Sequence, residues 1–79
     1  MVSVMWCESG GDPNAIGRRL NVNGTRDIGL FQINELTWEW WVNESGFIGF
    51  DIWNPWDQIE MAAWAFANGY ACHWVCAGC

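Results

Sequence analysis

Two carboxylic acids stand out in the sequence because of the residues around them. Glu8 follows the apolar side chain of Trp6 and precedes a glycine-rich turn. An apolar surrounding disfavours the charged form of a carboxylic acid and raises its pKa, which lets the acid donate a proton near neutral pH. Asp27 follows a turn-forming segment further along the chain. Each also has a plain structural interpretation: a solvated helix-end group for Glu8, and a partner of Arg26 or of water for Asp27.

The C-terminal tail holds a second group of reactive side chains. Three cysteines and the single histidine of the chain lie close together there: Cys72, His73, Cys76 and Cys79. Cys76, Cys79 and His73 could hold a zinc ion, with Cys7 or Cys72 as a further ligand. Two disulfides are the alternative, and four cysteines allow three pairings. We favour disulfides, because the chain has only one Cys-x-x-Cys pair, Cys76 and Cys79. A histidine lies near such a pair by chance as easily as by design.

Composition limits the size of the fold and excludes several classes of protein. The 79 residues are enough for one domain, spanning 1–79, in which eight Trp and four Cys compensate for a small core. With three Arg, no Lys and a net charge of −6, the chain lacks the cationic surface that nucleic acid binding requires. Membrane insertion is not expected, because no apolar run reaches 18 residues. We expect a monomer without a cofactor.

The elements that must position Glu8 and Asp27 are a short helix and a turn. Glycines and a proline follow Glu8, so the first helix is predicted to end just after it, with Glu8 in the last turn. Asn23 and Gly24 suit a type I′ turn. They predict a β-hairpin whose arms are residues 20–22 and 25–28.

Two further helices are predicted from their N-terminal signals. Asn34 suits the N-cap of a helix over residues 35–44, with apolar residues at helical spacing: Leu36, Trp40 and Trp41. After a loop over residues 46–53, Asn54 and Pro55 suit the start of another helix, which Asn68 ends. Its predicted apolar stripe consists of Ile59, Ala62, Ala63, Phe66 and Ala67. These elements indicate a mainly α (α+β) domain with one short β-hairpin.

Several segments resemble enzymes that cleave the bacterial cell wall. Residues 7–16, Cys-Glu-Ser-Gly-Gly-Asp-Pro-Asn-Ala-Ile, resemble the Glu-Ser motif of the lytic transglycosylases, and residues 29–34, Gly-Leu-Phe-Gln-Ile-Asn, resemble their Gly-Leu-Met-Gln-Ile segment. Residues 23–29 are similar to the hairpin of animal-type lysozymes, whose second carboxylate matches Asp27. Residues 69–76 are similar to the end of resuscitation-promoting-factor domains. The resemblance implies a small lysozyme-like helical domain of the lysozyme superfamily.

The resemblance also implies an activity. A muramidase cleaves the β-1,4 bond between N-acetylmuramic acid and N-acetylglucosamine in peptidoglycan, and Glu8 matches the acid that protonates the leaving oxygen. Asp27 matches the second carboxylate, a nucleophile or a stabiliser of the cationic sugar. A lytic transglycosylase is the alternative; it works without a second carboxylate and leaves 1,6-anhydro ends. A further alternative is an inactive wall-binding or structural module of the same fold.

Other residues receive roles from the same resemblance. Four are expected to bind substrate: Ser9, Phe31, Gln32 and Asn34. Their structural alternatives are a helix cap for Ser9, the core for Phe31, and hydrogen bonds to the backbone for the two amides. Tyr70 is a candidate replacement for the tyrosine of the transglycosylase Tyr-Asn-Ala-Gly segment, which is missing here. Most tryptophans are expected in the core, with Trp38 and Trp53 as candidate cleft walls.

In the resuscitation-promoting-factor domains, a terminal cysteine pairs with the cysteine before the catalytic Glu. That relation implies a Cys7–Cys76 disulfide, and Cys72–Cys79 would then be the second. Closing so long a loop stabilises a fold by about 4 kcal/mol in the chain-entropy model. Disulfides and a peptidoglycan substrate together indicate an extracellular or periplasmic protein, or a phage-encoded one released to the cell wall. The expected partner is the glycan strand.

Overall fold

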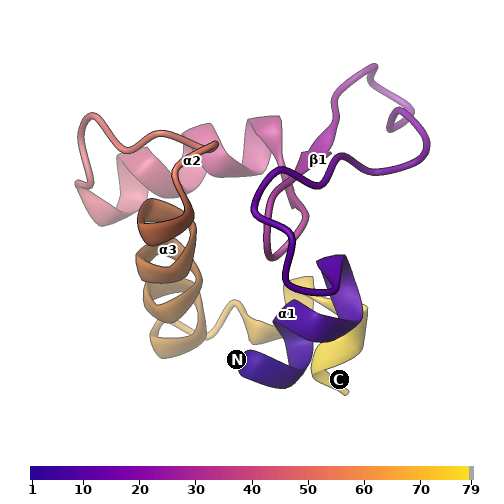
Figure 1. The fold of residues 1–79 in the computed structure, drawn as a ribbon. Coiled ribbons are helices and arrows are strands. Elements are labelled where there is room, and N and C mark those ends of the chain that lie inside the picture. Colours follow the sequence, from indigo (N-terminus) through magenta and orange to yellow (C-terminus); the bar gives the residue numbers. More distant parts are fainter. Residues whose placement is uncertain (79) are drawn as a thin grey trace.

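The computed structural model describes residues 1–78 (Figure 1). They form three α-helices, α1 (Val2–Ser9), α2 (Glu35–Ser45) and α3 (Pro55–Ala67). Strands β1 (Asp27–Ile28) and β2 (Ile33–Asn34) form one sheet, and the tail holds the 3₁₀ helices η1 (Ala71–His73) and η2 (Val75–Ala77). The mainly helical fold with one short hairpin is confirmed. None of these helices is long and apolar enough to cross a bilayer.

The first helix ends where the glycines predict. Glu8 lies in its last turn, and Gly10 closes the helix in the left-handed conformation at φ 65°, donating its N–H to the carbonyl of Trp6. Gly11 follows with φ 85°, and a Cβ there would lie 2.9 Å from the Trp6 ring. A side chain at either position would therefore strain the turn that carries Glu8. Only Val4 of this helix is buried, so α1 packs only weakly against the core.

The hairpin is displaced from its predicted position. Strands β1 and β2 pair antiparallel, with Ile28 opposite Ile33, and residues 29–32 form the connecting turn. The segment before β1 adds one bridge, between Ile16 and Ile28. The predicted arms at residues 20–22 and 25–28 are therefore wrong, apart from residues 27–28.

Burial explains the displacement. The turn at Gly24 does form, and the N–H of Gly24 donates to the carbonyl of Asn21 at 2.8 Å. However, Leu20 is largely exposed and Val22 fully exposed. Extending the β-ladder to these residues would therefore bury no apolar surface. Ile28 and Ile33 are both 1% exposed, and pairing them covers the core. The hydrophobic pattern fixes the register of a hairpin more strongly than a local turn signal does.

Both predicted N-caps are confirmed. The side chain of Asn34 accepts hydrogen bonds from the backbone of Leu36 and Thr37, and Asn54 does the same at the start of α3. The buried faces differ from the predicted ones. In α2, Trp41 is buried together with Trp38, whereas Leu36 and Trp40 are about half exposed. In α3 the buried residues are Gln58, Met61, Ala62 and Ala65, so only Ala62 of the predicted stripe lies fully inside.

An aromatic cluster joins the helices to the tail. Trp41 and Trp74 are each 1% exposed, and their rings lie 5.6 Å apart. Trp74 stacks on Phe66 of α3 at 5.2 Å and donates from its indole nitrogen to the carbonyl of Phe31 at 2.7 Å. The tail therefore completes the core.

Gln58 is the buried polar side chain that connects the loops around the core. Its Oε1 accepts from the backbone of Leu30 at 2.9 Å. Its Nε2 donates to the carbonyls of Pro13 at 3.0 Å and Ile52 at 2.7 Å. Gly29 packs so closely that a Cβ there would lie 2.5 Å from this amide. Three segments that carry no regular structure are thus held by one side chain.

Replacing this amide with a hydrocarbon of similar size tests its importance. Gln58→Leu leaves one N–H and two carbonyls without partners, and each buried unsatisfied group costs about 1–3 kcal/mol. We expect the free energy of unfolding to fall by about 3 kcal/mol in urea denaturation. The matched control Asn43→Leu, at an exposed position of α2, should change it by less than about 0.5 kcal/mol. Equal midpoints for Gln58→Leu and wild type would contradict this interpretation.

Candidate active site

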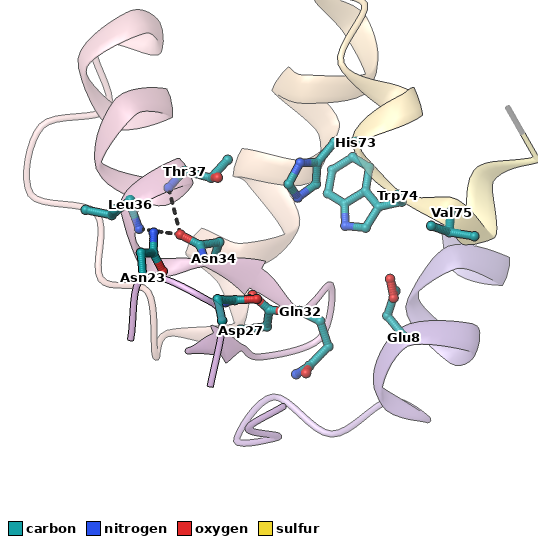
Figure 2. Close-up of a pocket in the computed structure, with 11 residues that line it drawn as sticks. Glu8, Asn23, Asp27, Gln32, Asn34, Leu36, Thr37, His73, Trp74 and Val75 are labelled. Carbon is teal, nitrogen blue, oxygen red and sulfur yellow. Dashed lines mark hydrogen bonds between the residues drawn. The ribbon is translucent and has the colours of Figure 1, made fainter. Parts of the chain in front are cut away.

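A pocket of about 520 Å³ opens between α1, the hairpin, the start of α2 and the tail (Figure 2). Eleven side chains line it: Glu8, Asn21, Asn23, Asp27, Gln32, Asn34, Leu36, Thr37, His73, Trp74 and Val75. Both carboxylates singled out in the sequence, Glu8 and Asp27, face this one pocket. The fold thus brings Glu8 and Val75, which are 67 positions apart in the sequence, to the same pocket.

Glu8 enters the pocket from the last turn of α1. Figure 2 places it beside the apolar side chains of Trp74 and Val75. Burial raises the pKa of Glu8 above its ordinary value of 4.5, and the negative charge of Asp27 raises it further. Both causes favour the protonated form. Glu8 therefore keeps a proton to higher pH than an exposed carboxyl does, and can donate it to a group in the pocket.

Asp27 lines the pocket from β1 as an unneutralised carboxylate. Its backbone carbonyl accepts from Gly17 at 2.9 Å, and its Oδ1 accepts from the Nδ2 of Asn21 at 2.9 Å. Arg26, the neighbouring cation, is bound elsewhere: its Nε lies 3.1 Å from the carboxylate of Glu35. No ion pair to Asp27 occurs within residues 1–78, and its charge acts on Glu8.

Removing the charge of Asp27 should change the pH dependence of the site. Asp27→Asn keeps an acceptor for Asn21 but removes the second cause of the raised Glu8 pKa. The pKa of Glu8 should fall, so a function that needs protonated Glu8 is lost at a lower pH. We expect the alkaline limb of the pH–activity profile to move to lower pH, together with the carboxyl-carbon titration of Glu8 by NMR. Asp12→Asn, at an exposed position outside the pocket, is the control; a Glu8 titration unchanged in Asp27→Asn would contradict the coupling.

The two predicted amides line the pocket but are bonded to the protein. Gln32, which has a left-handed backbone at φ 49°, donates from Nε2 to the carbonyls of Ala15 and Gly29. Asn34 caps α2 with its Oδ1 and donates from Nδ2 to the hydroxyl of Thr25 at 2.7 Å. Both amides thus form hydrogen bonds within the protein, which is the structural alternative to binding substrate. Their contacts with substrate stay predictions.

Three other predicted substrate-binding residues do not line this pocket. The hydroxyl of Ser9 donates to the carbonyl of Met5 and accepts from the N–H of Gly11, so it closes the end of α1. Phe31 is 2% exposed and belongs to the core. Tyr70 packs against Trp41, with ring centroids 5.8 Å apart.

The two tryptophans predicted as cleft walls are also placed elsewhere. Trp38 is 5% exposed and lies in the core. The guanidinium of Arg26 lies over the Trp53 ring, with its central carbon 5.7 Å from the centre of that ring. Neither lines the pocket around Glu8, so the cleft-wall prediction is wrong for this pocket. In so small a domain, the large rings are used for packing.

Sequence reasoning missed several residues of the pocket. The sequence suggests only a zinc-ligand role for His73 and no role for Thr37, although both line the pocket. The signal available for His73 is its place directly before Trp74, within residues 69–76, which resemble the end of resuscitation-promoting-factor domains. Thr37 carries no local signal, because only the packing of α2 brings it to the pocket.

The cysteine bridge between the first helix and the tail is confirmed. Cys7 and Cys76 form a disulfide across 69 residues, with Cα atoms 6.2 Å apart. Oxidised Cys76 cannot serve as a thiolate ligand, and residues 1–78 contain no cluster of three metal-binding side chains. The zinc alternative therefore has no support in the described residues. The predicted partner of Cys72 is Cys79, which lies outside them, so that second pairing stays a prediction.

A comparison with known families agrees with this arrangement. The model of one family, described as the transglycosylase SLT domain, matches residues 1–72. That family comprises lytic transglycosylases, lysozyme-like glycosidases that act on peptidoglycan. No curated protein and no solved structure shows significant similarity to the chain. The match covers both carboxylates of the pocket.

Proposed function

Since this chain belongs to the transglycosylase SLT domain family, we propose that it cleaves the β-1,4 bond between N-acetylmuramic acid and N-acetylglucosamine, with Glu8 as the general acid. The observation that carries the proposal is the position of Glu8. Its carboxyl lines a pocket, next to apolar side chains and across from a second carboxylate, and its pKa is raised for both reasons. A raised pKa suits an acid that protonates a leaving oxygen near neutral pH.

The proposed reaction is hydrolytic. Glu8 donates its proton to the glycosidic oxygen, the bond from that oxygen to C1 breaks, and positive charge develops at C1. Asp27 supports this step because its carboxylate lines the same pocket and forms no ion pair in the described part of the chain. It stabilises the cationic sugar as a charge or as a nucleophile. Water then adds at C1 and returns a proton to Glu8.

A lytic transglycosylase reaction is the second candidate, and the family match favours it. Here the 6-hydroxyl of the muramic acid attacks C1 in place of water, and its proton passes to Glu8. The product ends in a 1,6-anhydro sugar. Asp27 then stabilises the developing charge without forming a bond.

Product analysis separates the two reactions. Purified peptidoglycan is digested with the protein, and the soluble fragments are measured by mass spectrometry. Hydrolysis gives reducing ends, whereas transglycosylation gives ends that are lighter by one water. Anhydro ends alone would select the second candidate and exclude Asp27 as a nucleophile. No soluble fragments at all would contradict both reactions and leave an inactive module of the same fold.

The same reasoning leads to a proposed location. Peptidoglycan lies outside the inner membrane, and the Cys7–Cys76 disulfide is of a kind that persists in oxidising compartments. We therefore propose an extracellular or periplasmic site of action.

A further inference from the structure

Most polar side chains that line the pocket already have hydrogen-bond partners in the protein. Gln32 donates to two backbone carbonyls. Asn34 caps α2 and donates to Thr25. Asn21 donates to the carboxylate of Asp27. A sugar that used these groups would have to replace bonds already made, so the net gain would be small.

His73 differs from these residues because its ring is held by packing alone. The ring meets Trp41 edge-on at 5.0 Å and Trp74 edge-on at 5.2 Å. Within residues 1–78 neither ring nitrogen has a hydrogen-bond partner. Burial lowers the pKa of His73 below its ordinary value of 6.5, against a smaller opposing effect from the charge of Asp27. A lowered pKa favours the neutral imidazole, which has one nitrogen that donates and one that accepts.

Thr37 offers a second uncommitted group at the same end of the pocket. Figure 2 shows its side chain pointing toward His73, with Glu8 at the opposite end. The backbone N–H of Thr37 is bonded to Asn34, but its hydroxyl has no partner in the described part of the chain. A hydroxyl and a neutral imidazole can each donate and accept one hydrogen bond. That pair complements a ligand hydroxyl, which also does both.

We propose that His73, with Thr37, binds a hydroxyl group of a sugar ring in the part of the pocket between these two side chains, away from Glu8. The proposal rests on the proposed function, because it concerns a glycan strand that extends along the same pocket from the bond under attack. His73 is then a substrate-binding residue and takes no part in the proton transfer. Its effect should lie in KM, whereas the effect of Glu8 should lie in kcat.

The single histidine of the chain permits a direct test by NMR. A soluble tetrasaccharide of alternating N-acetylglucosamine and N-acetylmuramic acid is titrated into tag-free Glu8→Gln protein, which should not cleave it. We expect the ring C–H signals of His73 to shift with the same saturation curve as the backbone amide signals of Asp27 and Gln32. Ring signals that stay fixed while those amides move, or the absence of any binding, would overturn the proposal.

Kinetics with variants of His73 and Thr37 give an independent measurement. His73→Leu should raise KM about fivefold, which corresponds to one hydrogen bond of about 1 kcal/mol. The value of kcat should stay within about twofold, and His73→Gln, which keeps a donor and an acceptor, should restore KM. Thr37→Val should add little to His73→Leu, because both side chains bind one hydroxyl. An unchanged KM in His73→Leu would contradict the proposal.

The two proposals fail in different ways. If the tetrasaccharide binds and shifts His73 but wild type releases no product from it or from peptidoglycan, cleavage is wrong and the role of His73 stands. If wild type cleaves peptidoglycan and the His73 signals do not respond, cleavage stands and the role of His73 is wrong. Melting temperatures of His73→Leu and His73→Gln show whether a change in KM arises from lost packing on Trp41.

Discussion

Glu8→Gln is expected to lower the rate of peptidoglycan clearing by about 10²–10⁴-fold, the usual contribution of a positioned general acid. The amide has nearly the shape of the carboxylic acid but no acidic proton to give to the leaving oxygen. Substrate binding should persist, so the loss should lie in kcat rather than in KM. The measurement is the initial rate of clearing of a cell-wall suspension, followed by the release of reducing or anhydro ends.

Stability should respond in the opposite direction, which separates a catalytic loss from unfolding. The pKa of Glu8 is raised in the folded protein. The stability that the carboxyl contributes is therefore present at low pH and lost as pH rises through the raised pKa. Above that raised pKa, where the folded protein bears the cost of a partly buried charge, Glu8→Gln should leave the melting temperature unchanged or raise it. Glu60→Gln, on the exposed side of α3, is the matched control for both measurements.

If Glu8→Gln clears cell walls as fast as wild type does, the general-acid proposal is wrong. If Glu60→Gln loses activity to a similar degree, the loss arises from net charge and not from the pocket.

Local signals predicted the ends of the elements well. Asn34 and Asn54 cap their helices, and Gly10 ends the first one, because each of these signals acts through hydrogen bonds or backbone angles within a few residues. The buried faces were predicted less well. Gln58 is 1% exposed although glutamine reads as a surface residue. Its burial depends on three partners from distant loops, which no local pattern reveals.

The candidate site shows the same division between local and distant information. Glu8 and Asp27 could be identified because each lies in a segment with a family resemblance, and the structure places both in one pocket. For the other residues of these segments, the resemblance could not distinguish a role in binding substrate from a structural role. Gln32 and Asn34 lie in the resembling segment too, yet their amides are bonded to the protein itself. His73 lines the pocket because the tail packs onto Trp41, a contact across more than thirty residues of sequence.

The Cys7–Cys76 disulfide should contribute more to stability than any single side chain of the first helix. It closes a loop across 69 residues, and the chain-entropy model assigns such a loop about 4 kcal/mol. Helix α1 buries only Val4, so little else holds it against the tail. Since small domains are stable by about 5–15 kcal/mol in total, the loss of this bond would remove a large fraction.

We expect the double variant Cys7→Ser, Cys76→Ser to unfold in urea with a free energy lower by about 4 kcal/mol. Replacing both residues avoids a leftover thiol. The loss of activity should exceed the fraction unfolded, because Glu8 directly follows Cys7 and moves with the end of α1. Hydrogen exchange provides the local measurement: amides of α1 should lose protection first, while those of α3 stay protected. If α1 and α3 lose protection together, the bond stabilises the whole domain evenly; if neither changes, packing of the tail alone is enough to hold the acid in place.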